Sequence, residues 1–149
     1  MTLAVSVSAE DVRPALSRER VATIARAVLR AERVRNAMLS ITFVTRRAIA
    51  RLNARHLGHR GETDVISFGF APSGPRAPVV GDVYIAPEVA RENARRHGDG
   101  VRGETARLVV HGVLHVLGHE HPADGSREAS AMWRRQEALL RRLRRAGTA

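Results

Sequence analysis

The chain has 149 residues, of which 44% are hydrophobic and 27% charged, a composition typical of a globular domain rather than of a disordered segment. Cysteine is absent, so disulfides and thiolate metal sites are excluded, and any transition-metal site must use histidine, aspartate or glutamate. All 25 basic residues are arginine and the net charge is +10, which favours contact with phosphate groups.

The N-terminal segment has no features of a targeting or membrane segment. It lacks the basic region and the long apolar run of a signal peptide. No apolar stretch approaches the roughly 20 residues that a membrane-spanning helix needs. We therefore expect a soluble, cytoplasmic protein that makes no membrane contact.

Strand and helix patterns alternate in the first half of the chain. Alternating apolar residues in 3–8 predict a short strand, and apolar residues at helical spacing predict an amphipathic helix over 14–35. The β-branched residues of 38–45 predict a second strand. Thr45 can cap a following helix that ends near Leu57, before a loop.

The second half continues in the same way. Residues 64–70 and 79–86 are predicted to be strands on either side of a proline-rich loop, and Gly81 indicates a bulge in the second strand. Pro87 suits the first turn of a helix that ends near residue 98, and the last helix is predicted for 126–145. This order of elements predicts a single α/β (or α+β) domain over residues 1–149, with a mixed sheet of about four strands covered by helices.

Residues 107–122, RLVVHGVLHVLGHEHP, carry four of the seven histidines in an otherwise apolar segment. On a helix, His111 and His115 share one face, close enough for both rings to reach one metal ion. Gly118 can end the helix in a left-handed conformation, and His121 on the returning chain can supply a third nitrogen. This pattern predicts one zinc ion per chain on a zincin-like helix, with a fourth position open for water. His119 is the alternative third ligand.

The same histidine spacing is found in metzincin proteases, in which a glutamate after the first histidine is the general base. Gly112 takes that position here, so peptide hydrolysis would lose its proton acceptor. A metallopeptidase would need a base from elsewhere, and Glu120 is the nearest candidate.

The segment HGVLHVLGHEH resembles the signature H-G-x-L-H-L-x-G-Y-D-H of the YbeY family of bacterial rRNA-maturation endoribonucleases. Two further stretches, LNARHLGHRGETDVISF and GDVYIAPEVARENA, are similar to other stretches of that family, so the resemblance covers nearly the whole chain. It implies a single α/β domain, a zinc ion held by His111, His115 and His121, and a role in trimming small-subunit rRNA. It also implies RNA and the ribosome, or its assembly factors, as partners. A second alternative to the endoribonuclease is therefore a non-catalytic ribosome-assembly factor in which the zinc is structural.

The resemblance leaves one position of the family pattern unmatched. The family's arginine falls on Leu57 here, and Arg55 or Arg60 could supply a substitute guanidinium that binds RNA phosphates. Thr63 and Asp64 are further candidates for substrate binding. The alternative roles of these residues are solvated loop charges and turn capping.

Two carboxylates near the histidines are candidates for a supporting role. Glu120 could take a proton in catalysis or orient His121, and Glu104 could orient a histidine from the same helix face. A salt bridge with an arginine is the alternative role for each. Our main hypothesis is a metal-dependent endoribonuclease for single-stranded regions of rRNA, acting in rRNA maturation and ribosome quality control. The attacking nucleophile is either water or the RNA 2′-hydroxyl.

Overall fold

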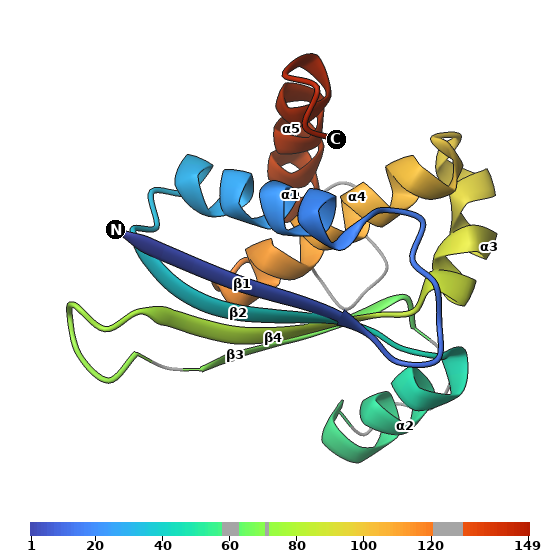
Figure 1. Ribbon diagram of the computed structural model, residues 1–149, viewed down its shortest axis with the longest axis horizontal. Helices are drawn as coiled ribbons and strands as arrows, with labels where there is room; N and C mark the ends of the chain where they lie inside the picture. Colours follow the sequence, from blue (N-terminus) through green and yellow to red (C-terminus); the bar gives the residue numbers. More distant parts are fainter. Residues whose placement is uncertain (58–62, 71, 121–129) are drawn as a thin grey trace.

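A computed structural model describes residues 1–57, 63–70, 72–120 and 130–149 of the chain (Figure 1). The predicted α/β fold with a four-stranded mixed sheet is confirmed. In chain order, the elements are β1 (Thr2–Ala9), α1 (Arg18–Ala31), β2 (Asn36–Phe43), α2 (Arg46–Leu57), β3 (Val65–Phe70), β4 (Val79–Ile85), α3 (Pro87–His97), α4 (Gly100–Val116) and α5 (Ala131–Arg145).

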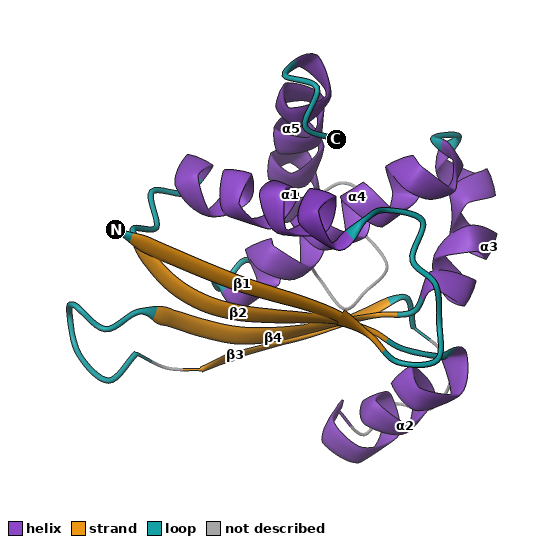
Figure 2. Cartoon of the chain, in the orientation of Figure 1, coloured by secondary structure: helices purple, strands orange, loops and turns teal. Residues whose placement is uncertain are grey.

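The sheet has the strand order β1-β2-β4-β3, in which β1, β2 and β4 run parallel and β3 is an antiparallel edge strand. The parallel neighbours β1 and β2 are joined by a helical crossover, α1, as parallel strands require. Figures 1 and 2 show α1 and α4 across one face of the sheet, whereas α2 lies at one end of the other face. Helix α4 therefore lies between the sheet and the helices α3 and α5, which it contacts.

The main core lies between the sheet and the helices α1 and α4. Alternate side chains of β2 and β4 face these helices and are buried: Ala37, Leu39, Ile41, Phe43, Val83 and Ile85. Helix α4 is buried on most of its surface because it is covered by the sheet and by other helices, which fits its apolar composition. A smaller cluster under α2 contains Val44, Ile49, Ile66, Ala86 and Val89.

Local capping explains where several elements begin and end. The Thr45 hydroxyl accepts a hydrogen bond from the Ala48 amide at 3.1 Å, which confirms the predicted cap of α2. Gly98 ends α3 in a left-handed conformation with φ of 73°. No helix in the described part of the chain combines the length and the apolar character that a membrane crossing needs.

Two predictions about local structure were wrong. The first helix covers Arg18–Ala31 rather than 14–35, because Ser17 caps its start and Arg33, with φ of 62°, turns the chain toward β2. The expected bulge at Gly81 is not formed, since this residue pairs in continuous register with Leu39 and Gly69. A Cβ at position 81 would lie 2.4 Å from a methyl carbon of Val116, so the glycine serves close packing of α4 on the sheet.

Helix α5 is described only from its capping residue Ser130, whose hydroxyl accepts a hydrogen bond from the Trp133 amide at 3.1 Å. The predicted start of this helix at residue 126 lies outside the described residues. The helix carries a buried apolar face, and its exposed face is rich in arginine, as its sequence pattern indicates.

Candidate metal centre

His111 and His115 lie side by side on α4, as their spacing predicts. Their ring centroids are 4.8 Å apart and the ring planes are inclined by 72°. The His111 side chain is buried and His115 is half-buried. Two imidazoles at this separation on successive helical turns are in range of one shared metal ion.

A hydrogen bond to Gln136 of helix α5 holds the His111 ring. The distance from His111 Nδ1 to Gln136 Oε1 is 2.6 Å, and both residues are buried. The amide nitrogen of Gln136 donates to Glu137 Oε2 at 3.0 Å, so the amide oxygen faces His111. An amide oxygen only accepts, and Nδ1 must therefore carry the proton while Nε2 is the basic nitrogen. A histidine binds a metal ion through an unprotonated ring nitrogen, and in this ring that nitrogen is Nε2.

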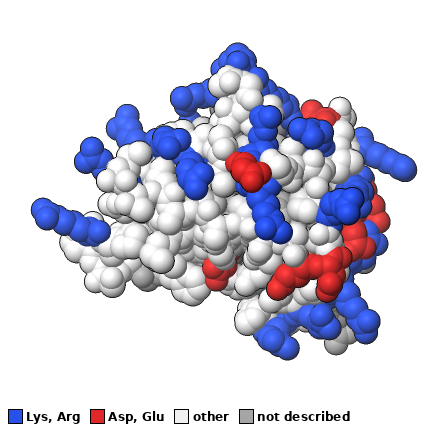
Figure 3. Space-filling view, viewed as in Figure 1, with Lys and Arg blue, Asp and Glu red and all other residues white. Residues whose placement is uncertain are grey.

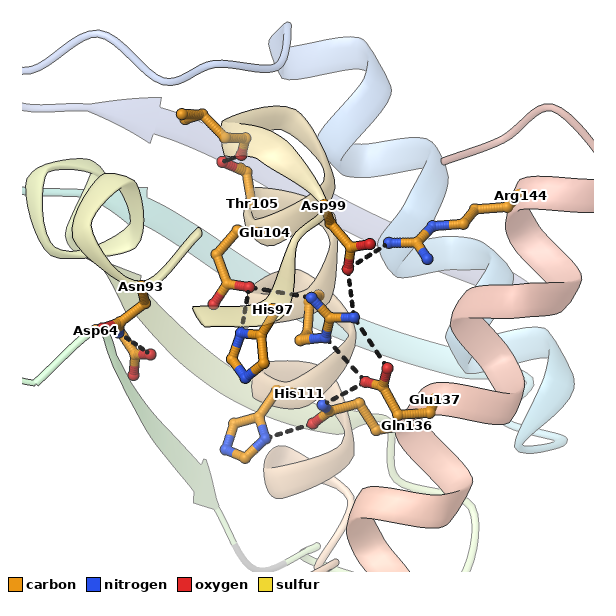
Figure 4. A network of polar contacts seen from close by, with 12 residues as sticks. Asp64, Asn93, His97, Asp99, Glu104, Thr105, His111, Gln136, Glu137 and Arg144 are labelled. Carbon is orange, nitrogen blue, oxygen red and sulfur yellow. Dashed lines mark hydrogen bonds and ion pairs between the residues drawn. The ribbon is translucent and has the colours of Figure 1, made fainter. Parts of the chain in front are cut away.

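Arg107 anchors this chain of hydrogen bonds from inside α4. Its guanidinium donates to both Glu137 oxygens, each at 2.9 Å, and to Glu104 Oε1 at 3.1 Å. It also forms an ion pair of 2.5 Å with Asp99, which Arg144 joins at 3.0 Å. Figure 4 shows how these side chains from α4 and α5 converge.

The charges of this cluster change one another's pKa. Burial raises the pKa of the Glu137 carboxyl, but hydrogen bonds from Arg107 and Gln136 outweigh burial and hold that pKa below its ordinary value. The same competition, with Arg144 and Arg107 as donors, lowers the pKa of Asp99. Burial lowers the pKa of Arg107, yet its carboxylate partners raise it above its ordinary value. These shifts keep Glu137 and Asp99 ionised and Arg107 protonated at neutral pH.

Glu104 belongs to this cluster of charged side chains. Of the two roles considered for it, the structure shows the salt bridge, because its Oε1 accepts from Arg107. The same oxygen lies 2.9 Å from Nδ1 of His97, the last residue of α3. Glu104 thus orients a histidine, but on the neighbouring helix.

A small hollow of about 70 Å³ opens beside His111, between α3, α4 and α5. Residues that line it include Asp64, Asn93, His97, Trp133 and Gln136. Asp64 is brought here from the start of β3, and its Oδ2 accepts a hydrogen bond from Asn93 Nδ2 at 3.0 Å. The neighbouring candidate Thr63 instead donates to the Val65 carbonyl at 3.4 Å and does not line the hollow.

The chain turns sharply after α4. Gly118 has φ of 97°, as predicted for the end of this helix, and the His119 amide donates to the Leu114 carbonyl at 3.0 Å. His119 Nε2 lies 2.7 Å from Oε1 of Glu32, and the other oxygen of Glu32, Oε2, accepts a hydrogen bond from Arg135. The ring of His119 is thus tied to α1 and α5, and Glu120 after it is exposed.

His121, the predicted third ligand, lies outside the described residues. Among the described residues, no group of three or more His, Asp or Glu side chains is placed to hold a metal ion. The two histidines of α4 are consistent with a three-histidine centre, because they present adjacent imidazoles and one of them has its tautomer fixed.

Arg55, a candidate for phosphate contact, is exposed on α2. With Arg51 and Tyr84 it lines a second hollow of about 220 Å³, at the end of the sheet face that α2 covers. His56 packs edge-on against Phe68, with ring centroids 5.4 Å apart. Leu57 is the last residue of α2, and Arg60 lies outside the described residues.

On the face that Figure 3 shows, arginine side chains are spread out rather than gathered in one patch. They project from the edges and from the middle of this face, and acidic side chains form a band at the lower right. Several of the basic groups are used within the fold, as in the ion pairs of Arg46 with Glu92 and of Arg135 with Glu32. Part of the arginine content therefore neutralises structural carboxylates.

Three residues that support this site were not predicted from the sequence. Gln136, Glu137 and Asn93 hold site residues in place, yet none was singled out from the sequence. A signal for Gln136 was present. It interrupts the apolar face of the last helix that also carries Leu139 and Leu140, where a polar side chain needs a buried partner.

Comparison with known proteins agrees with these observations. The family model described as "Endoribonuclease YbeY" matches residues 6–144. A relative of that name from Parafrankia sp. (strain EAN1pec) is 37% identical, with 80% of this chain and 81% of the relative covered. Another from Frankia alni is 36% identical, with 93% of this chain and 81% of the relative covered.

A solved structure supports the fold independently. The solution structure of a Thermotoga maritima protein matches with a TM-score of 0.59 over 97% of this chain and 94% of that one. The sequence identity is 18%, so this similarity concerns the fold alone.

Proposed function

This chain belongs to the YbeY family of endoribonucleases, and from that premise we propose that it is a metal-dependent endoribonuclease that matures small-subunit rRNA. The whole chain, residues 1–149, forms the catalytic domain in this proposal. The observation that carries it is the pair of adjacent imidazoles on α4, with His111 held by Gln136. The protein would work in the cytoplasm, on or near the ribosome.

The proposed metal ligands are His111, His115 and His121. Neutral imidazole nitrogens suit zinc, and they also accept nickel or cobalt. A divalent metal at this position supplies a Lewis acid that lowers the pKa of water and stabilises negative charge on a phosphodiester. We propose one zinc ion per chain.

The chain's own residues would bind and orient the RNA. Arg55, together with Arg51, is placed to bind backbone phosphates beside the hollow under α2, and Arg60 could add a further contact. Asp64, held by Asn93 next to His111, is an acceptor for a ribose hydroxyl. Thr63 precedes Asp64 and would contact the RNA at the start of β3. Glu120, exposed after His119, is the candidate for proton transfer.

Two other functions receive less support. A metallopeptidase of metzincin type would need a base after the first histidine, and Gly112 provides none. A purely structural zinc in an assembly factor does not agree with the endoribonuclease name that the relatives share.

A metal analysis on four variants tests the centre. We expect about one zinc ion per wild-type chain and its loss in His111→Ala, His115→Ala and His121→Ala. His119→Ala should retain the metal, since its ring is tied to Glu32 instead. Retention in His121→Ala with loss in His119→Ala would contradict the proposed ligand set.

Cleavage assays on the same preparations test the activity. Wild-type protein should cleave single-stranded rRNA fragments and leave casein intact, and His115→Ala should lose RNA cleavage but keep most RNA affinity. Undiminished cleavage by metal-free His115→Ala would exclude the metal from the reaction. Co-sedimentation with small ribosomal subunits tests the proposed partner.

A further inference from the structure

A line of polar side chains leads to Nδ1 of the His111 ring. It begins at Arg107, passes through Glu137 and Gln136, and ends at Nδ1 of His111 (Figure 4). Gln136 is only 1% exposed and lies on the apolar face of α5. A buried amide in such a place is stabilising only when its donors and its acceptor are matched.

Each step in this line has a fixed direction. Arg107 has donors and no acceptor, so the Glu137 carboxylate is the acceptor in both of their hydrogen bonds. The ionised Glu137 cannot donate, so the amide nitrogen of Gln136 must face it. The amide oxygen is then directed at His111, which must donate from Nδ1.

The alternative orientation of the amide would have the opposite effect on the ring. If Gln136 were flipped, its NH₂ group would face Nδ1 and the proton of the neutral imidazole would move to Nε2. The nitrogen that must meet the metal would then carry hydrogen instead of a lone pair. Glu137 prevents this flip because its ionised carboxylate can only accept a hydrogen bond from the amide nitrogen of Gln136. Arg107 holds that carboxylate in place.

We propose that Gln136 is the positioning residue of the metal centre, which holds His111 in one tautomer and one ring orientation, and that Arg107 and Glu137 hold Gln136 in turn. This inference rests on the proposed role of His111 as a ligand. In this proposal, helix α5 does more than pack against α4. The positive charge of Arg107 fixes the direction of each hydrogen bond in the line, and these directions determine which nitrogen of His111 is free to bind a metal ion.

Zinc affinity of the purified full-length protein, measured by competition with a chromophoric chelator, tests this role. Gln136→Met keeps the length of the side chain but removes the acceptor, and we expect its zinc affinity to fall about 10- to 100-fold. Leu140→Met, a buried change on the same helix, is the matched control and should leave zinc affinity unchanged.

A second measurement separates positioning from packing. The ¹⁵N shifts of the imidazole in metal-free protein report the tautomer directly. Wild-type His111 should be a single tautomer protonated at Nδ1, and Gln136→Met should show a mixture. Glu137→Gln should also produce a mixture, because the amide of Gln136 then has no fixed direction. Thermal unfolding of the metal-free proteins measures any general loss of stability.

The outcomes distinguish the proposed metal centre from the proposed positioning role of Gln136. Wild-type protein that binds no zinc would overturn the metal centre and the positioning role together. Wild-type binding with an unchanged zinc affinity in Gln136→Met would overturn the positioning role alone. A weaker affinity in that variant with a single, unaltered tautomer would also contradict it, since the loss would then come from packing.

Discussion

Gly112 lies so close to Val83 that a Cβ at position 112 would be 2.5 Å from Cγ1 of Val83. It would also lie 3.3 Å from the hydroxyl of Ser67, which donates a hydrogen bond to the Gly112 carbonyl at 3.0 Å. The residue after the first histidine therefore faces the sheet. A glutamate there would meet β3 and β4, so close packing excludes the base that a metzincin protease places at this position.

The first prediction concerns this contact. Gly112→Ala should destabilise the protein, because overpacking costs about 1–3 kcal/mol while the gain in helix propensity is at most about 1 kcal/mol. Urea unfolding monitored by circular dichroism measures the difference. Val83→Ala removes the clashing methyl carbon, so the double variant should be more stable than the sum of the two single changes indicates. Strict additivity would contradict the proposed contact.

The sequence pattern was sufficient to predict the helix that carries His111 and His115 on one face and the place where it ends. The spacing of His111 and His115 and the glycine at 118 are local features, and local geometry alone determines what they do. The same holds for Thr45 as the cap of α2. Such predictions succeed because each involves residues within one or two helical turns.

Contacts between distant segments were not predictable in this way. Gln136 meets His111 only because α5 packs on α4, and their separation of 25 positions carries no periodic signal. The bulge expected at Gly81 was wrong for a related reason, since a Val116 side chain from α4 fills the space above the strand. Both contacts depend on how α4 packs against α5 and against the sheet.

The second prediction is a loss of stability in acid. The pKa values of Glu137 and Asp99 are lower in the folded state than in an unfolded chain, although burial opposes this shift. As pH falls, the unfolded chain therefore takes up protons first. The contribution of both carboxylates is fully present above their ordinary pKa, and it is lost as pH falls below that value and through the lowered pKa of the folded state. Urea unfolding at a series of pH values measures this dependence.

Two variants identify the source of that dependence. Glu137→Gln should reduce the slope of stability against pH in the acid range, whereas Glu19→Gln, an exposed change on α1, should leave it unaltered. Arg107→Met should cost about 3–5 kcal/mol at neutral pH, because it leaves the buried Glu104 without its cation. An identical slope in wild type and Glu137→Gln would contradict this assignment.

The third prediction concerns the segment after α4. Glu32 joins His119 to Arg135, and it lies at the end of α1. His119→Ala should lower stability by about 0.5–1.5 kcal/mol, the usual value of one hydrogen bond, and leave the zinc content unchanged. Thermal unfolding and metal analysis on one preparation provide both values. Loss of zinc with unchanged stability would show that His119 acts as a ligand.

The last prediction concerns how RNA is bound. Arg51 and Arg55 are exposed on α2 and line one hollow, so both can reach phosphates of the same strand. If each contributes one phosphate contact, Arg55→Gln should weaken binding similarly for all RNA sequences and reduce the slope of log K against log salt by about 0.7–1. A matched control is Arg141→Gln, an exposed change on α5, which Figure 1 shows far from α2.

A salt titration of binding to a single-stranded RNA measures these slopes for wild type and the two variants. Arg141→Gln should behave like wild type if the contact is local to α2, and it should lose the same slope as Arg55→Gln if only net charge matters. Equal losses would therefore contradict a phosphate site on α2. A smaller slope in Arg55→Gln alone would locate RNA contact at the end of the sheet where Tyr84 and Arg51 lie.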